Sequence, residues 1–69
     1  MSDVRVWSVE LNVREDATSM FIPAELLPDA VRGDQVTITS VEPATIRHGR
    51  IDEVLDDRER GRFFAVSLD

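Results

Sequence analysis

The segment 20–41, MFIPAELLPDAVRGDQVTITSV, restricts the possible folds of this chain more than any other segment. Its apolar start predicts a short strand over residues 20–22. Pro23 ends this strand, because proline has no N–H for a strand ladder. The helix-forming residues that follow are stopped by Pro28, since the residue before a proline is pushed out of the α region. We therefore predict a single helical turn, which is too short to be stable unless it docks on the rest of the chain.

A glycine corner follows that turn. The pair Gly33-Asp34 combines a residue that tolerates positive φ with a polar turn residue, and we predict a positive φ at Gly33. Beyond the corner, apolar and polar residues alternate from Gln35 to about Val41, with β-branched side chains throughout. This alternation is typical of a strand with one buried face.

The N-terminal part of the chain also alternates. Residues 4–13, VRVWSVELNV, change parity once, and we expect the face that carries Trp7 and Val13 to lie in the core. A change of parity is what a β-bulge produces, and bulges help small sheets to curl. Residues 14–19 are polar and have the length of a hairpin connection, so we predict that the first two strands form a hairpin.

The segment 43–60 is compatible with two structures. The apolar residues within 50–55 have helical spacing, but Gly49 would lie inside that helix at a cost of about 1 kcal/mol. Residues 62–68, RFFAVSL, alternate strictly and predict a strand. We favour a hairpin in which residues 50–55 pair with residues 62–68 across a polar tip, and we keep a helix within 43–60 as the alternative.

Together these segments predict one domain, residues 1–69, of mainly β structure. We expect a small five-stranded antiparallel curled sheet or barrel with one short helical turn, whereas a helix within 43–60 would make the fold α+β. Two stretches carry a resemblance to a known fold: Gly33-Asp34-Gln35-Val36, and Gly49-Arg50-Ile51 followed later by Phe64-Ala65-Val66. Their cadence resembles the SH3-like small barrels of many bacterial translation, transcription and accessory proteins. The resemblance implies a fold class and no functional residue.

The composition restricts the possible partners. Fourteen acidic residues outnumber eight basic ones, all of them arginine, and the formal net charge is −6. Nucleic-acid binding requires a positive surface, so this balance argues against it and fits a protein partner. A domain this short buries only about 60% of its unfolded surface, so we expect it to be stabilised by self-association or by a larger subunit.

The same composition restricts the location and the chemistry. There is no cysteine for disulfides or thiolate metal clusters. No apolar run approaches the roughly 20 residues that cross a bilayer, and residues 1–7 lack the basic-then-apolar pattern of a signal peptide. We therefore expect a cytoplasmic protein that makes no membrane contact.

No residue pattern in this sequence indicates catalysis. His48 is the only histidine, and no serine lies in a nucleophile-elbow motif. There is no glycine-rich phosphate loop. Acidic residues would hold a divalent cation only if they converged, and a strand directs neighbours to opposite faces. We predict that the chain is not an enzyme and has no catalytic, cofactor-binding or metal-binding residues; the acidic residues considered are Asp52, Glu53, Asp56, Asp57 and Glu59.

Two surfaces are candidates for binding. Strand parity places Phe64 in the core, so Phe63 points outward, and the same reasoning directs Phe21 and Val54 outward. Such an apolar cluster would be typical of a binding hot spot. A bulge would reverse this parity, and the turn after Pro23 would cover part of the cluster if it folded over the outer face. The alternative surface is basic and consists of Arg47, Arg50, Arg58, Arg60 and Arg62.

These observations lead to three functional hypotheses. The first is a non-enzymatic, acidic protein-interaction module that self-associates or serves as an accessory subunit of a larger complex. The alternative is a nucleic-acid- or ribosome-associated accessory barrel that uses the arginine-rich C-terminal hairpin together with its aromatic residues. The third is an enzyme subunit whose site is completed only on oligomerisation.

Overall fold

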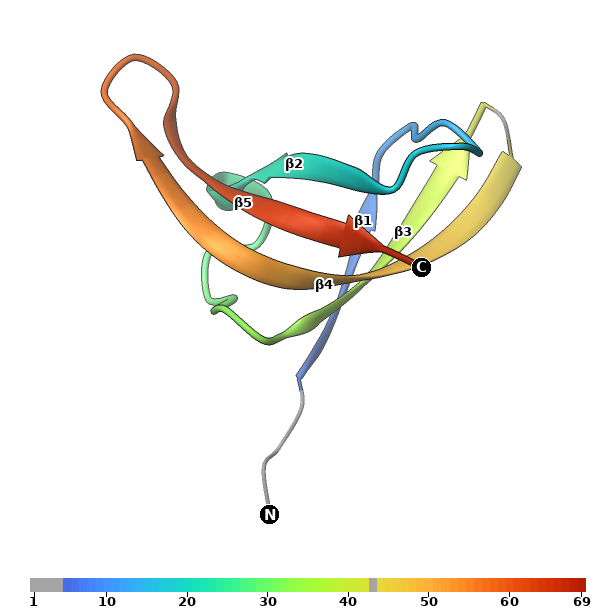
Figure 1. Cartoon of the computed structure of the whole chain (residues 1–69), viewed down its shortest axis with the longest axis horizontal. Coiled ribbons are helices and arrows are strands. Elements are labelled where there is room, and N and C mark those ends of the chain that lie inside the picture. The colour runs from blue at the N-terminus through green and yellow to red at the C-terminus, as the bar shows by residue number, and fades with distance from the viewer. Residues whose placement is uncertain (1–4, 43) are drawn as a thin grey trace.

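The structure, a computed structural model, describes residues 5–42 and 44–69 (Figure 1). The described residues are mainly β with one short helical turn, as predicted. Residues 44–57 form one long strand, so the alternative of a helix in this segment is wrong; Val4 and Pro43, which the predictions included, lie outside the described residues. In chain order the elements are β1 (Val6–Glu10), β2 (Ser19–Pro23), the 3₁₀ turn η1 (Ala24–Leu26), β3 (Gln35–Val41), β4 (Ala44–Asp57) and β5 (Gly61–Leu68).

The five strands form one mixed sheet in the order β1-β3-β4-β5-β2. β3, β4, β5 and β2 pair antiparallel in succession, whereas β1 pairs parallel with β3. The predicted hairpin between the first two strands is wrong, because β1 and β2 lie at opposite ends of the sheet. The predicted hairpin of residues 50–55 with 62–68 is confirmed. The sheet curls strongly but does not close into a barrel (Figure 1).

The segment between β1 and β2 crosses from one end of the sheet to the other. The Asn12 side-chain oxygen accepts hydrogen bonds from the N–H groups of Val41 and Glu42, at 3.1 and 3.2 Å. Near the end of the crossing, the Thr18 carbonyl accepts from the Leu68 N–H at 2.9 Å. These partners are distant in the sequence, which is why a polar connection of hairpin length gave no sign of the crossing.

Arg47 of β4 ties this crossing segment to the sheet. Its pairing with Ile38, which is fully buried, places Arg47 on the core side of β4. The guanidinium donates to four main-chain oxygens, three of which belong to the crossing segment, so it supplies hydrogen bonds to a stretch that lies outside the strands. The acceptors are the main-chain oxygens of Arg14 (3.0 Å), Glu15 (3.1 Å), Ala17 (2.8 Å) and Asp69 (2.8 Å).

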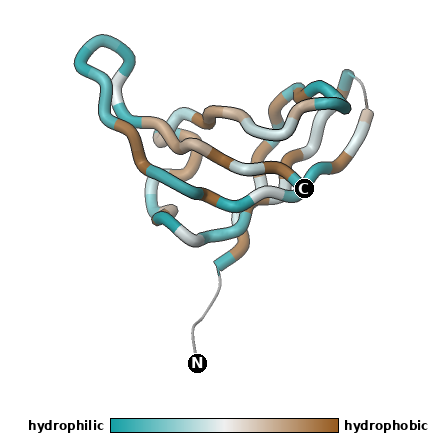
Figure 2. The backbone as a smooth tube through the Cα atoms, viewed as in Figure 1, coloured by the Kyte–Doolittle hydropathy of each residue, from teal (hydrophilic) through white to brown (hydrophobic). Residues whose placement is uncertain are grey.

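One hydrophobic core lies on the inner face of the curled sheet. Trp7, Val9 and Leu11 pack against it, so the predicted core face of the first strand is confirmed. Buried and more exposed residues alternate along β3, as one of its faces turns to the core. Figure 2 shows the hydropathy of the residues along the whole backbone. The buried apolar residues are Val13, Ile22, Leu27, Ala30, Val36, Ile38, Ile51, Phe64 and Val66.

The glycine corner, Gly33-Asp34, lies just before β3 and forms hydrogen bonds with two other strands. Gly33 has a φ of +96°, which confirms the predicted positive φ. The Gly33 N–H donates to the Ile51 carbonyl at 2.8 Å, and the Ile51 N–H donates to the Asp34 carbonyl at 2.9 Å. Asp34 is buried, and its carboxylate accepts from Trp7 Nε1 at 2.8 Å and from the Val31 N–H at 3.1 Å. The corner is therefore held to both β4 and β1.

Within the described ranges, no helix has the length and apolar character needed to cross a bilayer.

Candidate interaction surface

Phe21 and Phe63 form an aromatic pair on the outer face of the sheet. They come from the neighbouring strands β2 and β5, where Phe21 pairs with Ala65 and Pro23 pairs with Phe63. Their ring centroids lie 5.4 Å apart with an interplanar angle of 85°, an edge-to-face arrangement that aromatic pairs favour. Phe63 is half-buried, whereas Phe21 is 65% exposed. The sequence-predicted direction of both side chains agrees with this placement.

Val54 does not lie with the two phenylalanines. The register of β4 against β5 shifts between Ile51 and Glu53, so Asp52 is an extra residue in β4. After this bulge Val54 pairs with Phe64 and takes the core-side face, and Leu55 pairs with Phe63 and takes the outer face. The parity prediction for Val54 is wrong for this reason, and Leu55 occupies the position that Val54 was expected to have.

The outer-face residues together line a shallow hollow of about 430 Å³. We call the set Phe21, Pro23, Leu55 and Phe63 the aromatic surface. The hollow is bordered by Arg60 and Arg62 of the β4–β5 hairpin. The 3₁₀ turn that follows Pro23 leaves Phe21 exposed, so it does not cover this surface. Leu55 could have been found from sequence only by placing the bulge, whereas Pro23 lies two residues after Phe21 in β2 and shares its face.

The tip of the β4–β5 hairpin projects beyond the body of the molecule and is hydrophilic (Figures 1 and 2). The Asp57 carboxylate accepts from the N–H groups of Glu59 and Arg60, at 2.8 and 3.3 Å, which closes the turn. Gly61 completes it with a φ of +83°, a conformation that favours glycine. Arg60 and Arg62, in and just after this turn, lie beside the aromatic surface.

The five arginines of the alternative basic surface do not form one patch. Arg47 lies on the core side and is bound to main-chain carbonyls. Arg50 lies in a groove on the outer face of β4. Arg58, Arg60 and Arg62 belong to the hairpin, where Arg62 forms an exposed ion pair with Asp56 at 3.6 Å. An exposed pair of this kind contributes little to stability, about 0–1 kcal/mol.

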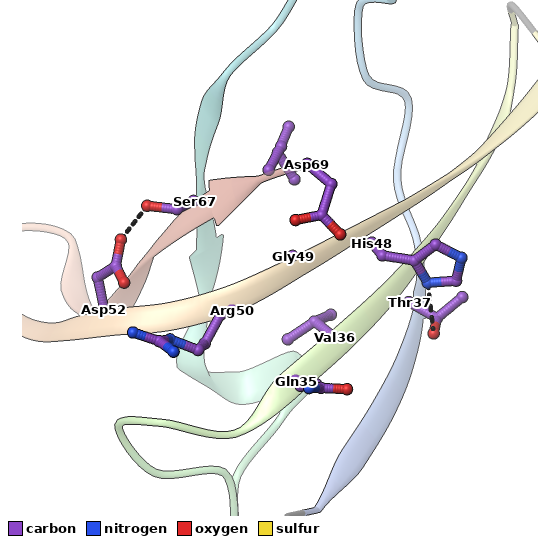
Figure 3. Close-up of a pocket in the computed structure, with 10 residues that line it drawn as sticks. Gln35, Val36, Thr37, His48, Gly49, Arg50, Asp52, Ser67 and Asp69 are labelled. Carbon is purple, nitrogen blue, oxygen red and sulfur yellow. Dashed lines mark hydrogen bonds between the residues drawn. The ribbon is translucent and has the colours of Figure 1, made fainter.

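The groove around Arg50 is the second hollow of the outer face and has a volume of about 580 Å³ (Figure 3). His48 Nδ1 lies 3.5 Å from Thr37 Oγ1, at the limit of hydrogen bonding. On the other side of the groove the Ser67 hydroxyl donates to the Asp52 carboxylate. Positive and negative side chains are mixed here, so the groove favours neither an anionic nor a cationic ligand.

The acidic residues of β4 and its hairpin do not converge. In the part of the chain that the structure describes, no group of three or more histidine, cysteine, aspartate or glutamate side chains is arranged to hold a metal ion. The acidic side chains of this region are exposed along the hairpin.

The surroundings of the Asp34 carboxyl group lower its pKa. The Trp7 N–H lowers the pKa of the Asp34 carboxyl below its ordinary value, and the Val31 N–H and the charge of Arg5 act in the same direction, while burial opposes them. The Arg5 guanidinium lies 4.7 Å from the centre of the Trp7 ring. This cluster holds β1 to the corner before β3, so we assign it to the fold and not to a binding site.

No protein-family model, curated protein or solved structure matches this chain. A function must therefore be argued from the surfaces described above.

Proposed function

We propose that this chain is a non-enzymatic, cytoplasmic interaction domain that binds another protein through the aromatic surface. The observation that carries this proposal is the Phe21–Phe63 pair, because an aromatic ring that is 65% exposed beside a second one is costly to leave in water. Aromatic residues of this kind are over-represented at binding hot spots. Both rings project from paired strands and not from a loop, so little conformational entropy is lost when a partner covers them.

The expected contribution of these rings is large enough to measure. Fully burying a phenylalanine side chain contributes about 1.5–3 kcal/mol. Truncating an aromatic residue at a hot spot weakens binding by about 2 kcal/mol or more, which corresponds to about thirtyfold in Kd. The bordering Arg60 and Arg62 would add specificity by rejecting strongly basic partner surfaces.

The test compares Phe21→Ser and Phe63→Ser, singly and combined, with the control Ile46→Ser. Ile46 is 61% exposed and lies on the outer face near the other end of β4, so it matches Phe21 in exposure but not in position. Affinity capture from native lysate with mass spectrometry, together with light scattering, reports partner binding and self-association. Circular dichroism and the melting temperature report folding.

We expect the phenylalanine variants to stay folded and to lose partner binding or self-association by about thirtyfold, whereas Ile46→Ser keeps both. Retention of binding in the Phe21→Ser, Phe63→Ser double variant would exclude the aromatic surface. Unfolding of either variant would show that the pair supports the core and would also contradict the proposal.

A nucleic-acid function is the second candidate, and one observation favours it. Arg60 and Arg62 border the same hollow as Phe21 and Phe63, and an aromatic surface beside basic residues is how single strands are bound. The acidic residues of the hairpin weaken the positive field there. Fluorescence anisotropy with labelled single-stranded oligonucleotides tests it: binding that falls steeply with salt and is lost on Arg60→Glu supports this candidate, and no binding at low salt excludes it.

A further inference from the structure

β2 is an end strand of the sheet, and among the described residues no strand pairs with its second edge. The Leu68 N–H donates to the Thr18 carbonyl, which makes these two residues a hydrogen-bonded pair of the β2–β5 ladder. Because hydrogen-bonded pairs alternate along an antiparallel ladder, Met20 and Ile22 also direct their main-chain groups to β5. The N–H and C=O groups of Ser19 and Phe21 therefore point to the free edge.

This edge lacks the charged residues that normally protect an end strand from pairing with another chain. Residues 17–24 contain no charged residue, and this is the longest such run in a chain whose formal net charge is −6. The other end strand, β1, includes Glu10 and follows Arg5. The second copy of an acidic chain would meet like charge at most surfaces, but it would meet none along β2.

We propose that two copies of this chain pair along their β2 edges, antiparallel and with a twofold axis at Met20. The proposal rests on the proposed function and identifies the partner as a second copy. In this register Ser19 lies opposite Phe21 of the second copy, and each of these residues donates its N–H to, and accepts at its C=O from, the residue opposite. Pro23, which has no N–H, lies beyond the paired residues, so its missing donor leaves no gap in the ladder.

The register also joins the aromatic surfaces of the two copies. Ser19 and Phe21 both point to the outer face, where the small Ser19 side chain leaves room for the Phe21 ring of the second copy. The two Phe21 rings are diagonal neighbours, a separation that aromatic side chains span. The dimer thus buries the most exposed aromatic residue of the chain, and both sheets become one continuous sheet.

The test uses Ser19→Pro with Ser8→Pro as its matched control. Proline removes the outward N–H of Ser19 and leaves the bonds from β2 to β5 intact, since end strands tolerate proline where the N–H faces solvent. In β1 the Gln35 N–H donates to the Arg5 carbonyl and the Leu11 N–H donates to the Thr39 carbonyl, so the Ser8 N–H points to the free edge of β1. The two substitutions are therefore chemically identical changes on opposite edges of the sheet.

Sedimentation equilibrium over a range of protein concentrations measures the dimer Kd. We expect a dimer for the wild type and for Ser8→Pro, and a Kd at least about tenfold weaker for Ser19→Pro, which removes one donor from each copy. Added sodium chloride should tighten the wild-type dimer, because it screens the repulsion between two acidic chains. An acidic partner held by Arg60 and Arg62 would instead be released by salt.

Amide hydrogen exchange of the wild-type protein gives a second measurement that does not depend on the folding of a variant. We expect exchange at the Ser19 and Phe21 amides to slow as protein concentration rises, while exchange at Ser8 stays constant. A monomer at millimolar concentration, an unchanged Kd for Ser19→Pro, or concentration-independent exchange at Ser19 and Phe21 would each overturn the β2 dimer. Capture of a different protein that depends on Phe21 and Phe63 would then still support the proposed function.

Discussion

Gly49 of β4 leaves no room for a side chain against β5, and we predict that a single added methyl group is costly there. Gly49 pairs with Leu68 and is buried. A Cβ atom at this position would lie 2.6 Å from Val66 Cγ1, 2.8 Å from the Ser67 carbonyl oxygen and 3.1 Å from Leu68 Cδ2. The carbonyl belongs to the backbone of β5, so it can give way only if the two strands separate.

The size of the effect follows from these contacts. Overpacking a well-packed site costs about 1–3 kcal/mol, and a clash with backbone belongs at the upper end of that range. Replacing glycine by alanine returns about 0.4–1 kcal/mol by restricting the unfolded chain. The net loss for Gly49→Ala is then about 2 kcal/mol, or about 8–16 °C in Tm for a domain of this size. That is a large part of the total, because 69 residues correspond to a stability of about 3–10 kcal/mol.

Thermal and urea unfolding followed by circular dichroism measure this loss, and a double-mutant cycle with Val66→Ala tests its origin. Val66→Ala removes the atom nearest to the new methyl group, so the double variant should lose less stability than the sum of the single variants. The remaining loss reflects the Ser67 carbonyl. A Gly49→Ala variant that melts within about 2 °C of the wild type, where about 8 °C or more is expected, would refute the reasoning, and so would strict additivity with Val66→Ala.

Three further outcomes are expected for the fold. Gly33→Val should destabilise the protein by more than about 1 kcal/mol in urea unfolding, because a β-branched residue tolerates the φ of +96° poorly; an unchanged Tm would contradict this. Arg47→Met should cost about 2 kcal/mol, since it removes charged hydrogen bonds to the crossing segment, and faster amide exchange in residues 14–17 would locate the loss. Asp34 has a folded-state pKa below that of the unfolded chain, so its carboxylate stabilises the fold above the unfolded pKa, and this contribution disappears as pH falls through the folded pKa. Asp34→Asn should therefore flatten the acid limb of a Tm-against-pH profile, and an identical acid limb would show that the Trp7 contact is not linked to protonation.

The amino-acid sequence determined the features that depend on neighbours in the chain. Pro23 and Pro28 limited the helix to one turn, which the structure has as η1. The Gly33-Asp34 pair predicted a corner with positive φ, and the alternation after it predicted a strand at Gln35–Val41, where β3 begins and ends. These predictions held because proline, glycine and β-branched residues restrict their own backbone, whatever surrounds them.

The sequence also placed part of the candidate surface. Adjacent phenylalanines in an alternating strand must point to opposite faces, so Phe63 follows once Phe64 is in the core. Phe21 follows in the same way from Ile22, which is fully buried. That the two rings meet edge to face depends on β2 pairing with β5, and the sequence carries no local mark of that pairing.

Only the tertiary structure decided the pairing of distant segments. β1 pairs in parallel with β3, and the segment after β1 crosses to the other end of the sheet to reach β2. Hydrogen bonds of the Asn12 and Arg47 side chains, to partners far away in the sequence, hold that segment in place. The bulge at Asp52 exchanged Val54 for Leu55 on the outer face. A bulge is placed by the competition between two registers of β4 against β5, each with its own side-chain packing. The sequence of β4 does not show by itself which register is more stable. Only the packed sheet therefore decided that Leu55, and not Val54, belongs to the aromatic surface.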